Sequence, residues 1–488
     1  MQDSSLTLLT DLYQITMAYG YWKTGMAQRP AVFHLFYRKN PFQHPYAIAC
    51  GLEPAIKWLS SLHFTAADVQ YLGSLMGADG KSLFSESFLN YLQRLRFTCD
   101  IDAIPEGTVV LPNEPLIRVQ GPLLQAQFIE TALLNLINFS TLIATKSSRI
   151  VQAAGGDAVL EFGLRRAQGM DGGLTASRAA YIGGCVATSN VLAGKRYGIP
   201  VRGTHAHSWV MGFDNEPEAF ERYAAAMPNN CIFLVDTYNT LEGVRNAIDS
   251  AKKLKADGHQ LLGIRLDSGD LAALSIAARQ MLDEAGLPDA AIVASDDLDE
   301  YRIAELKQRG AKINIWGVGT RLVTAYDQPA LGGVYKLAAI QDEAGVWQHK
   351  IKLSEQPIKV SNPGMLDTVR VFDAKGQPIA DAICKPHQKD NPLEIVDEQN
   401  GTSKHFNEPN TQSLLVPVFR EGTLVYEAPD IHETRSYCLS QQALFKNVDW
   451  STYPAGLERS VYEMKQELIH AHRSTAINPT PSKDMTIK

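Results

Sequence analysis

The sequence contains 488 residues, of which 45% are hydrophobic and 20% charged, and its formal net charge is −7. This length predicts two or three domains with enough apolar material for substantial cores. The negative charge and the lack of a dense lysine and arginine run argue against a broad face that binds nucleic acid or a membrane surface.

The first part of the chain is expected to form an N-terminal α+β domain over residues 1–150. Residues 7–23 place apolar side chains at helical spacing, and Ala31–Tyr37 has the pattern of a strand. Residues 97–120 contain short strands separated by Pro and Gly turns, and a long helical stretch follows from about Leu123 to Ala154.

The middle of the chain alternates short apolar runs with helical stretches. The runs expected to be strands are Ala158–Phe162, Ile199–Val201, Ile232–Val235, Leu261–Leu266, Ala291–Ala294 and Ile313–Trp316. The helical stretches between them include Glu216–Ala226, Thr240–Leu254, Leu271–Ala285 and Leu298–Arg309. Apolar runs without alternation are typical of strands buried on both faces. We therefore predict an α/β class domain over residues 151–345, an incomplete or irregular barrel, although an open doubly wound sheet would give the same pattern.

The last part of the chain, residues 346–488, is expected to be β-rich, with a C-terminal helix and a loose tail after Ser474. Its apolar runs, together with the one just before it, are Val334–Ile340, Lys350–Leu353, Val369–Phe372 and Ser413–Val418.

The sequence also predicts a cytoplasmic protein. Its six scattered cysteines contain no CxxC pair and are expected to be reduced thiols. No signal peptide is expected, because the N-terminus lacks a basic stretch followed by an apolar run. No apolar stretch approaches the ~20 residues of a membrane span.

Polar residues follow the carboxyl end of each expected strand. In chain order they are Arg165 and Arg166, Thr204–Ser208, Asp236 and Thr237, Arg265 with Asp267–Asp270, Ser295–Asp297, and Gly317–Thr320. In a parallel barrel these ends open onto one face, where the active site lies. Helix N-capping is the alternative for Asp270, Ser295 and Asp297. It does not account for the arginines or for the paired histidines.

Several of these strings resemble the nicotinate phosphoribosyltransferase family. They occur in the family's order from residue 10 to about residue 370, as Thr10–Gln14, Phe33–Arg38, Glu161–Gly169, Gly203–Ser208, Arg265–Asp270 and Gly317–Thr320. The resemblance implies the type II phosphoribosyltransferase fold, in which a barrel-like domain lies beside a smaller sandwich-like domain built from N-terminal and C-terminal segments. It also implies a head-to-tail homodimer with shared active sites.

The family reaction makes nicotinate mononucleotide and pyrophosphate from nicotinate and phosphoribosyl pyrophosphate, in NAD salvage from nicotinic acid. The resemblance implies that ATP hydrolysis is coupled to it through a phosphohistidine and that Mg²⁺ is required. The residues that correspond to the family's catalytic groups are His207, the phosphorylated histidine, with Asp236 and Asp267. Those that correspond to its nicotinate site are Tyr13, Phe162, Arg165, Thr204 and Arg265, and those of its phosphate site are Arg38, Gly319 and Thr320.

The chemistry of these residue types fits such substrates. A guanidinium meets a carboxylate through two hydrogen bonds, and glycine-rich loops offer backbone N–H groups to phosphates. Carboxylates near the ribose can bind Mg²⁺ and stabilise positive charge on the sugar. Alternatives stay open: either arginine could form a structural salt bridge, Phe162 and Tyr13 could be packing residues, and Arg38 could be a solvated charge.

The sequence also bears on whether the substrate is the acid, nicotinate, or its amide, nicotinamide. Nicotinamide-using relatives carry an Asp in the segment that corresponds roughly to Ala187–Asn190, whereas this chain has Thr188 and Ser189 there. An aspartate would repel a carboxylate ligand, so its absence favours nicotinate.

Two other classes of function fit parts of this sequence. A metal-dependent hydrolase could use His205 and His207, but it needs histidines at later strand ends, and the one histidine between Cys231 and Ile340, His259, precedes its strand. A pyridine-nucleotide sensor without turnover would be expected to have lost the catalytic histidine and aspartates, which are present.

Overall fold

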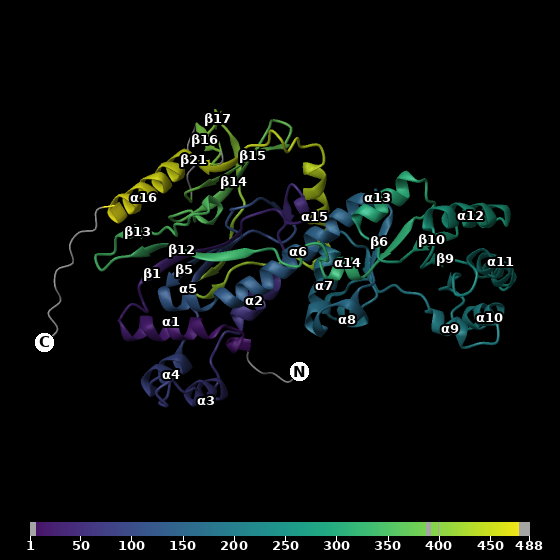
Figure 1. The fold of residues 1–488 in the computed structure, drawn as a ribbon, viewed down its shortest axis with the longest axis horizontal. Helices are drawn as coiled ribbons and strands as arrows, with labels where there is room; N and C mark the ends of the chain where they lie inside the picture. Colours follow the sequence, from purple (N-terminus) through teal and green to yellow (C-terminus); the bar gives the residue numbers. More distant parts are fainter. Residues whose placement is uncertain (1–5, 387–391, 399, 478–488) are drawn as a thin grey trace. The chain divides into compact units, whose positions relative to one another are not determined.

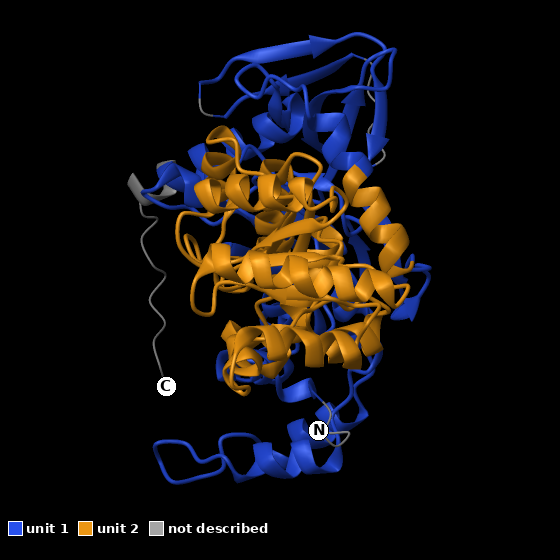
Figure 2. Cartoon of the chain, turned by 90° about the vertical axis from the view of Figure 1, so that its right-hand side faces the viewer, with its two compact units in different colours: residues 1–138, 331–429, 440–488 blue, residues 139–330, 430–439 orange. Residues whose placement is uncertain are grey.

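The structure of the chain is a computed structural model that describes residues 6–386, 392–398 and 400–477. Contacts within the chain divide it into two compact units (Figure 2). Unit 1 comprises Met1–Asn138, Leu331–Pro429 and Ser440–Lys488, and unit 2 comprises Phe139–Ala330 and Asp430–Leu439. Each unit is described by itself below, with the elements labelled as in Figure 1.

Unit 2 contains one six-stranded parallel sheet in the order β7-β6-β11-β10-β9-β8. Its strands are β6 (Ala158–Glu161), β7 (Ala187–Thr188), β8 (Ile232–Leu234), β9 (Gly263–Leu266), β10 (Ala291–Ala294) and β11 (Ile315–Val318). Within the described residues no ladder joins β7 to β8, so the sheet is a half-barrel and not a closed one.

Helices surround this sheet (Figure 2). They are α7 (Gly169–Gly183), α8 (Val191–Tyr197), α9 (His207–Met211), α10 (Glu216–Ala226), α11 (Thr240–Ala256), α12 (Leu271–Glu284), α13 (Glu300–Gln308) and α14 (Thr320–Val323). These helices alternate with the strands as expected. They cover the sheet so that three residues of β10 are fully or almost fully buried: Ile292, Val293 and Ala294. Burial on both faces explains the apolar runs in the sequence.

One of the strands predicted for this sheet does not form. Ile199–Val201 forms only an isolated bridge between Val201 and Thr188, and the strand beside β6 is the two-residue β7. Pro200 has no N–H to donate to a ladder, which limits pairing there. A two-residue strand is too short to leave an apolar run in the sequence.

Unit 1 contains two larger sheets and a two-stranded one. The first has the order β13-β12-β1-β5-β3-β19-β20 and antiparallel pairing throughout. Its strands are β1 (Pro30–Tyr37), β3 (Asp100–Ala103), β5 (Ile117–Pro122), β12 (Gly333–Gln341), β13 (Trp347–His349), β19 (Val416–Arg420) and β20 (Thr423–Leu424). The pairing of β1 with β12 and of β3 with β19 joins the two ends of the chain in one sheet.

The second sheet comes entirely from the later part of the chain, in the order β17-β16-β21-β15-β14-β18. Its strands are β14 (Asp367–Phe372), β15 (Pro378–Cys384), β16 (Leu393–Val396), β17 (Ser403–Phe406), β18 (Asn410–Ser413) and β21 (Ala455–Glu458). The two-stranded sheet pairs β2 (Ala47–Ile48) with β4 (Val109–Val110). With this material unit 1 holds the larger share of the chain, which corrects the expectation of a smaller companion domain.

The helices of unit 1 are placed mostly as the sequence predicts. They are α1 (Leu12–Lys23), α2 (Leu52–Ser60), α3 (Ala66–Ser74), α4 (Glu86–Arg94), α5 (Leu123–Phe128) and α16 (Arg459–Ile477). Two further helices, α6 (Glu130–Ala154) and α15 (Ile431–Phe445), contribute residues to both units. The stretch expected as one helix from Leu123 is therefore two, and Lys350–Leu353 is not a strand.

Two expectations concern the rest of the chain. The loose tail expected after Ser474 lies, from residue 478 onward, outside the described residues. Across the part of the chain that the structure covers, no helix is long and apolar enough to cross a membrane.

Candidate active site

The candidate site lies at the carboxyl ends of the half-barrel strands. In the parallel register Leu234 of β8 lies opposite Arg265 of β9, which in turn lies opposite Val293 of β10. The residues that follow these strands are therefore neighbours along one edge of the sheet. Asp236, Asp267 and Ser295, the serine that follows β10, lie together at this edge.

Arg265 is the best-anchored side chain of the edge. Its Nε donates to Ser295 Oγ at 2.8 Å, its Nη1 donates to Thr204 Oγ1 at 2.9 Å, and its Nη2 donates to Asp267 Oδ1 at 3.1 Å. The salt bridge that remained an alternative for this arginine is thus present. The guanidinium is held in one orientation, and most of its donors are engaged within the protein.

The two aspartates differ in what their oxygens contact. Asp236 Oδ2 accepts from the Asp267 backbone N–H at 2.8 Å and from Ser268 Oγ at 2.7 Å. Asp236 Oδ1 is buried and has no hydrogen-bond partner among the described residues. Burial alone would raise the pKa of Asp267, but the hydrogen bond from Ser295 and the charge of Arg265 outweigh it and lower that pKa. Asp267 is therefore a carboxylate at neutral pH.

His207 faces this aspartate. It is the first residue of α9, its side chain is 40% exposed, and its Nε2 lies 3.6 Å from Asp267 Oδ2. On the other side of the ring, Nδ1 lies 3.2 Å from Thr237 Oγ1. An exposed imidazole with partners at both nitrogens has a fixed orientation and stays accessible to a ligand.

His205 has the opposite environment. It is 7% exposed, and its ring packs against Phe220, Tyr223 and Phe233. Its Nε2 accepts from the Leu234 N–H at 3.3 Å, and its Nδ1 lies 3.4 Å from the Ala206 carbonyl. Burial, and then the nearby charge of Arg265, lower its pKa to about 4. His205 is a neutral packing residue, so it does not compete with His207 for a ligand.

Close backbone packing shapes the ends of β6 and β11. A Cβ added to Gly317 would lie 2.7 Å from Phe162 Cδ2, so the glycine makes room for the Phe162 ring. A Cβ at Gly319 would lie 3.3 Å from the Phe162 carbonyl oxygen. The expected aromatic residue and the expected phosphate loop, which ends in Thr320 at the start of α14, are thus in direct contact.

Arg165 contrasts with Arg265. It lies in the 3-10 turn Leu164–Arg166 after β6, its side chain is exposed, and within the described residues no hydrogen bond or ion pair engages it. Of the two arginines expected near a carboxylate ligand, Arg165 is the one with free donors.

Three acids after the strands are placed as follows. Asp270 is the N-cap of α12, where it accepts from two backbone N–H groups, and it also pairs with Arg309, so the capping alternative is correct for it. Asp297 pairs with Arg321 and caps no helix. Asp296 was not singled out from the sequence, yet it has φ of 111° and an exposed side chain. Burial, and then the charges of Asp267 and Asp297, raise its pKa.

The sequence places Ser295 and Thr237 after strand ends on the expected active-site face, but it assigns neither of them a role. In the structure Ser295 contacts both Arg265 and Asp267. The signal was available, because both residues follow strand ends that carry other site residues.

Two expected site residues belong to unit 1. Tyr13 lies in α1 with its side chain exposed, and burial together with the charge of Glu130 raises its pKa. Arg38 follows β1, is half-buried, and has a pKa that burial lowers. The other nine expected residues belong to unit 2.

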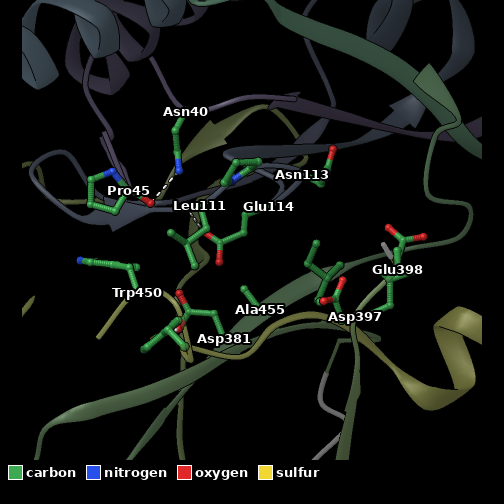
Figure 3. Close-up of a pocket in the computed structure, with 15 residues that line it drawn as sticks. Asn40, Pro45, Leu111, Asn113, Glu114, Asp381, Asp397, Glu398, Trp450 and Ala455 are labelled. Carbon is green, nitrogen blue, oxygen red and sulfur yellow. Dashed lines mark hydrogen bonds between the residues drawn. The ribbon is translucent and has the colours of Figure 1, made fainter. Parts of the chain in front are cut away.

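Unit 1 also has a cavity of about 350 Å³, which Figure 3 shows. Its fifteen described lining residues include four acids, Glu114, Asp381, Asp397 and Glu398, and no lysine or arginine. None of the expected site residues lines it. Two of these acids already have cationic partners, Asp381 with Arg370 and Glu398 with Lys465, and no lining residue offers a positive charge for a phosphate or carboxylate.

The chain is similar to known proteins over most of its length. Residues 8–138 match the family model described as the nicotinate phosphoribosyltransferase (NAPRTase) N-terminal domain, residues 158–381 match that of the NAPRTase family, and residues 367–455 match that of the C-terminal domain. A relative from Bacillus subtilis (strain 168), named nicotinate phosphoribosyltransferase, is 44% identical over 493 residues, which cover 97% of each chain.

The chain belongs to the nicotinate phosphoribosyltransferase family.

More distant members are also similar over most of their length. The Caenorhabditis elegans nicotinate phosphoribosyltransferase is 36% identical, with 96% of this chain and 94% of that protein covered. The crystal structure of human nicotinic acid phosphoribosyltransferase superposes with a TM-score of 0.82 at 31% identity, covering 94% of this chain and 99% of that one. The family resemblance seen in the sequence is confirmed.

The metal-hydrolase alternative finds no support at this site. Among the described residues no group of three or more His, Cys, Asp or Glu side chains is arranged to hold a metal ion. His205 in particular uses its Nε2 to accept a backbone N–H.

The buried imidazole of His205 gives a testable pH dependence. An unfolded histidine binds a proton near pH 6.5, whereas the folded chain lowers the pKa of His205 to about 4. The unfolded state therefore binds more protons between these values, and folding stability should fall as the pH drops from 6.5 to 4. The contribution of this shift is up to about 3 kcal/mol.

Urea denaturation at a series of pH values measures this effect. His205→Gln keeps an acceptor for the Leu234 N–H but cannot be protonated, so its stability should fall less over this range than that of the wild type. His259→Gln, at a histidine outside the site, is the control and should keep the wild-type slope. An unchanged slope in His205→Gln would contradict a buried neutral imidazole.

Proposed function

We infer that this chain is an enzyme that joins nicotinate to the ribose 5-phosphate of phosphoribosyl pyrophosphate and releases pyrophosphate. The product, nicotinate mononucleotide, enters NAD salvage from nicotinic acid. The observation that carries the inference is the 44% identity to a nicotinate phosphoribosyltransferase over 97% of the chain. The cluster of Arg265, Asp267 and His207 at one sheet edge supports it.

The reaction forms one bond as it breaks another. The pyridine nitrogen lone pair forms the new bond to the anomeric carbon, and the bond from that carbon to pyrophosphate breaks with its electrons leaving on oxygen. Positive charge builds on the ribose ring meanwhile. The carboxylates of Asp236 and Asp267 are suited to stabilise that charge, since both are fixed before the reaction by bonds from neighbouring strands.

The ends of β6 and β11 are suited to nicotinate and to the 5-phosphate. We propose that Arg165 binds the nicotinate carboxylate, because its donors are free, and that the Phe162 ring packs against the pyridine. Arg265 and Thr204 would contribute a fixed positive charge and a hydroxyl to the same ligand. Gly319 and Thr320 would supply N–H and O–H donors to the phosphate, with Arg38 near the pyrophosphate.

Mg²⁺ is proposed as the cofactor. The unpartnered buried Oδ1 of Asp236 fits a hard cation, and Asp267 offers a second carboxylate beside it. In proteins Mg²⁺ is held by one or two carboxylates together with substrate phosphates and water, so a cluster of three acidic ligands is not required. When bound, it would neutralise charge on the departing pyrophosphate.

ATP is proposed as a coupled substrate that phosphorylates His207. An imidazole nitrogen would form a bond to the γ-phosphorus while the bond to the ADP oxygen breaks, and water would later cleave the phosphorus–nitrogen bond to release phosphate. The exposure of His207 and its partners Asp267 and Thr237 support this assignment. His205 is sequestered, which removes the rival nucleophile.

A homodimer with shared active sites is also proposed. Large apolar side chains are exposed in the N-terminal segment of unit 1 (Leu6, Leu9, Leu12 and Tyr13). Others are exposed on unit 2 (Met170, Val191, Leu192 and Met211). Exposed apolar groups of this size suit a subunit interface, and Tyr13 would then reach the site of the partner. The six cysteines are all described and buried, and none is in a disulfide within the described residues, which suits the proposed cytoplasmic location.

Pyrophosphate release from phosphoribosyl pyrophosphate tests the main proposal. Release should depend on nicotinate, with kcat/KM at least about 100-fold lower for nicotinamide, which forms no ion pair with an arginine. Arg265→Lys should lose roughly 1.5–3 kcal/mol of transition-state stabilisation, since one ammonium cannot replace bonds to three partners. Arg222→Lys, at an exposed helix pair with Glu218, is the matched control. Comparable kcat/KM for acid and amide would refute the assigned substrate.

Mixed dimers test the shared site. Tyr13→Ala and Arg165→Ala subunits should each be inactive alone, and heterodimers carrying one of each should recover some activity, because one composite site would keep both residues. Differently tagged subunits, purified in tandem, allow the measurement. Verified heterodimers without any recovery would place both residues in the site of a single subunit.

His207→Ala tests the coupling to ATP. The variant should lose nicotinate-dependent ATP hydrolysis and acid-labile phosphate, yet keep slow ATP-independent transfer, because the arginines and aspartates remain. His259→Ala should couple ATP normally. Phosphate mapped to another residue, or coupling that survives in His207→Ala, would overturn the assignment.

A further inference from the structure

Ser295 is the first residue after β10, and it occupies the centre of the charged cluster. The residue is 6% exposed. Its hydroxyl accepts from Arg265 Nε at 2.8 Å and donates its proton to Asp267 Oδ1. A hydroxyl has one proton and two lone pairs, so the donor and one acceptor site are both used within the site.

The hydroxyl is not needed to build the backbone around it. The Ser295 N–H donates to the Leu266 carbonyl at 2.9 Å, as a continuation of the β9–β10 ladder. The next helix, α13, is capped by Asp299, which accepts from the Arg302 N–H at 2.8 Å. The capping alternative is therefore excluded for Ser295. Its side chain contacts the two charged residues of β9 instead.

This contact decides which way the Asp267 carboxylate faces. Oδ1 receives both Ser295 and Arg265 Nη2, so Oδ2 is turned toward His207 Nε2, 3.6 Å away. Without the hydroxyl, Oδ1 of Asp267 would keep one contact, to Arg265 Nη2, and the carboxylate could rotate about its side-chain bonds. Arg265 would also lose the bond to its Nε, which fixes the plane of the guanidinium.

We propose that Ser295 is a positioning residue that locks Arg265 and Asp267 in one arrangement and so keeps the Asp267 carboxylate facing His207. The proposal deepens the function inferred above and rests on it. Ser295 need not contact substrate, because it acts through the two residues that it holds.

Three variants of the full-length enzyme separate this role from simple packing. Ser295→Ala removes the hydroxyl, and Ser295→Thr keeps it. Ser275→Ala is the matched control, since Ser275 is a fully buried serine of α12 whose Oγ donates to the Ala272 carbonyl and accepts from the Lys312 N–H. Nicotinate-dependent pyrophosphate release and ATP hydrolysis would be measured from pH 4.5 to 8, and melting temperatures would establish that each variant is folded.

Ser295→Ala should lower kcat/KM for nicotinate roughly 10- to 100-fold, as expected for loss of hydrogen bonds to charged groups. Less ATP should be hydrolysed in response to nicotinate. Ser295→Thr should return kcat/KM to within about threefold of the wild type, a residual loss of under 1 kcal/mol that the added methyl group accounts for.

The outcomes are distinguishable. If the wild type releases pyrophosphate in response to nicotinate but Ser295→Ala behaves like Ser275→Ala in kcat/KM and in nicotinate-dependent ATP hydrolysis, the proposal for Ser295 alone is overturned. A folded Ser295→Thr enzyme as impaired as Ser295→Ala would overturn it as well. A wild type without nicotinate-dependent release would refute the proposed function, and this inference with it.

Discussion

The guanidinium of Arg265 is the charge on which the arrangement of the site depends. Its side chain is only 13% exposed, so it must be paired and hydrogen-bonded within the protein. Its partners Thr204, Asp267 and Ser295 come from three different segments of unit 2. The hydrogen bonds of this one buried arginine therefore connect the loop before α9, the end of β9 and the end of β10.

The consequences extend from Arg265 to the rest of the edge. Asp267 is fixed by Arg265 on one side, and its backbone N–H fixes Asp236 on the other. Asp236 then keeps one buried oxygen without a partner. A buried unpaired carboxylate oxygen is costly, and a protein retains one where a ligand or cation supplies the missing partner. The unpartnered oxygen of Asp236 therefore marks a position where a cation or a hydrogen-bond donor of a ligand would be stabilised.

Much of the half-barrel could be predicted from the sequence, because burial on both faces leaves a visible apolar run. β6, β8, β9 and β10 were found in this way. β7 was not, since a strand of two residues leaves no apolar run in the sequence. The pairing of β1 with β12 joins segments about 300 residues apart, and local patterns contain no information on such contacts. The family resemblance implied that N-terminal and C-terminal segments share a domain, as β3 and β19 do, but the sequence prediction placed β12 in the middle domain.

The candidate site was predictable in its residues but not in their environments. Family resemblance points to His207, but residue type alone does not separate the two histidines of the Thr204–Ser208 string. The packing of Phe220, Tyr223 and Phe233 around His205 does separate them. Likewise, nothing in the sequence distinguishes an arginine engaged by three partners from one with free donors. Ser295 was undervalued for the same reason, because a serine after a strand is more often a cap than a contact between two charges.

The distribution of charge along the sheet explains why a carboxylate substrate suits this edge. The acid at the end of β6, Glu161, is fully buried and saturated by bonds from Gly163, Ser177 and Thr188, so it presents no charge to a ligand. The accessible charge after β6 is therefore positive, while the ends of β9 and β8, three and four strands away in the order of the sheet, carry aspartates, with Arg265 of β9 already paired to Asp267. An anionic ring substituent at one side and a sugar that becomes positive at the other match this polarity. An amide would leave the positive side without a counter-charge, and discrimination against it follows from electrostatics and does not require a steric barrier.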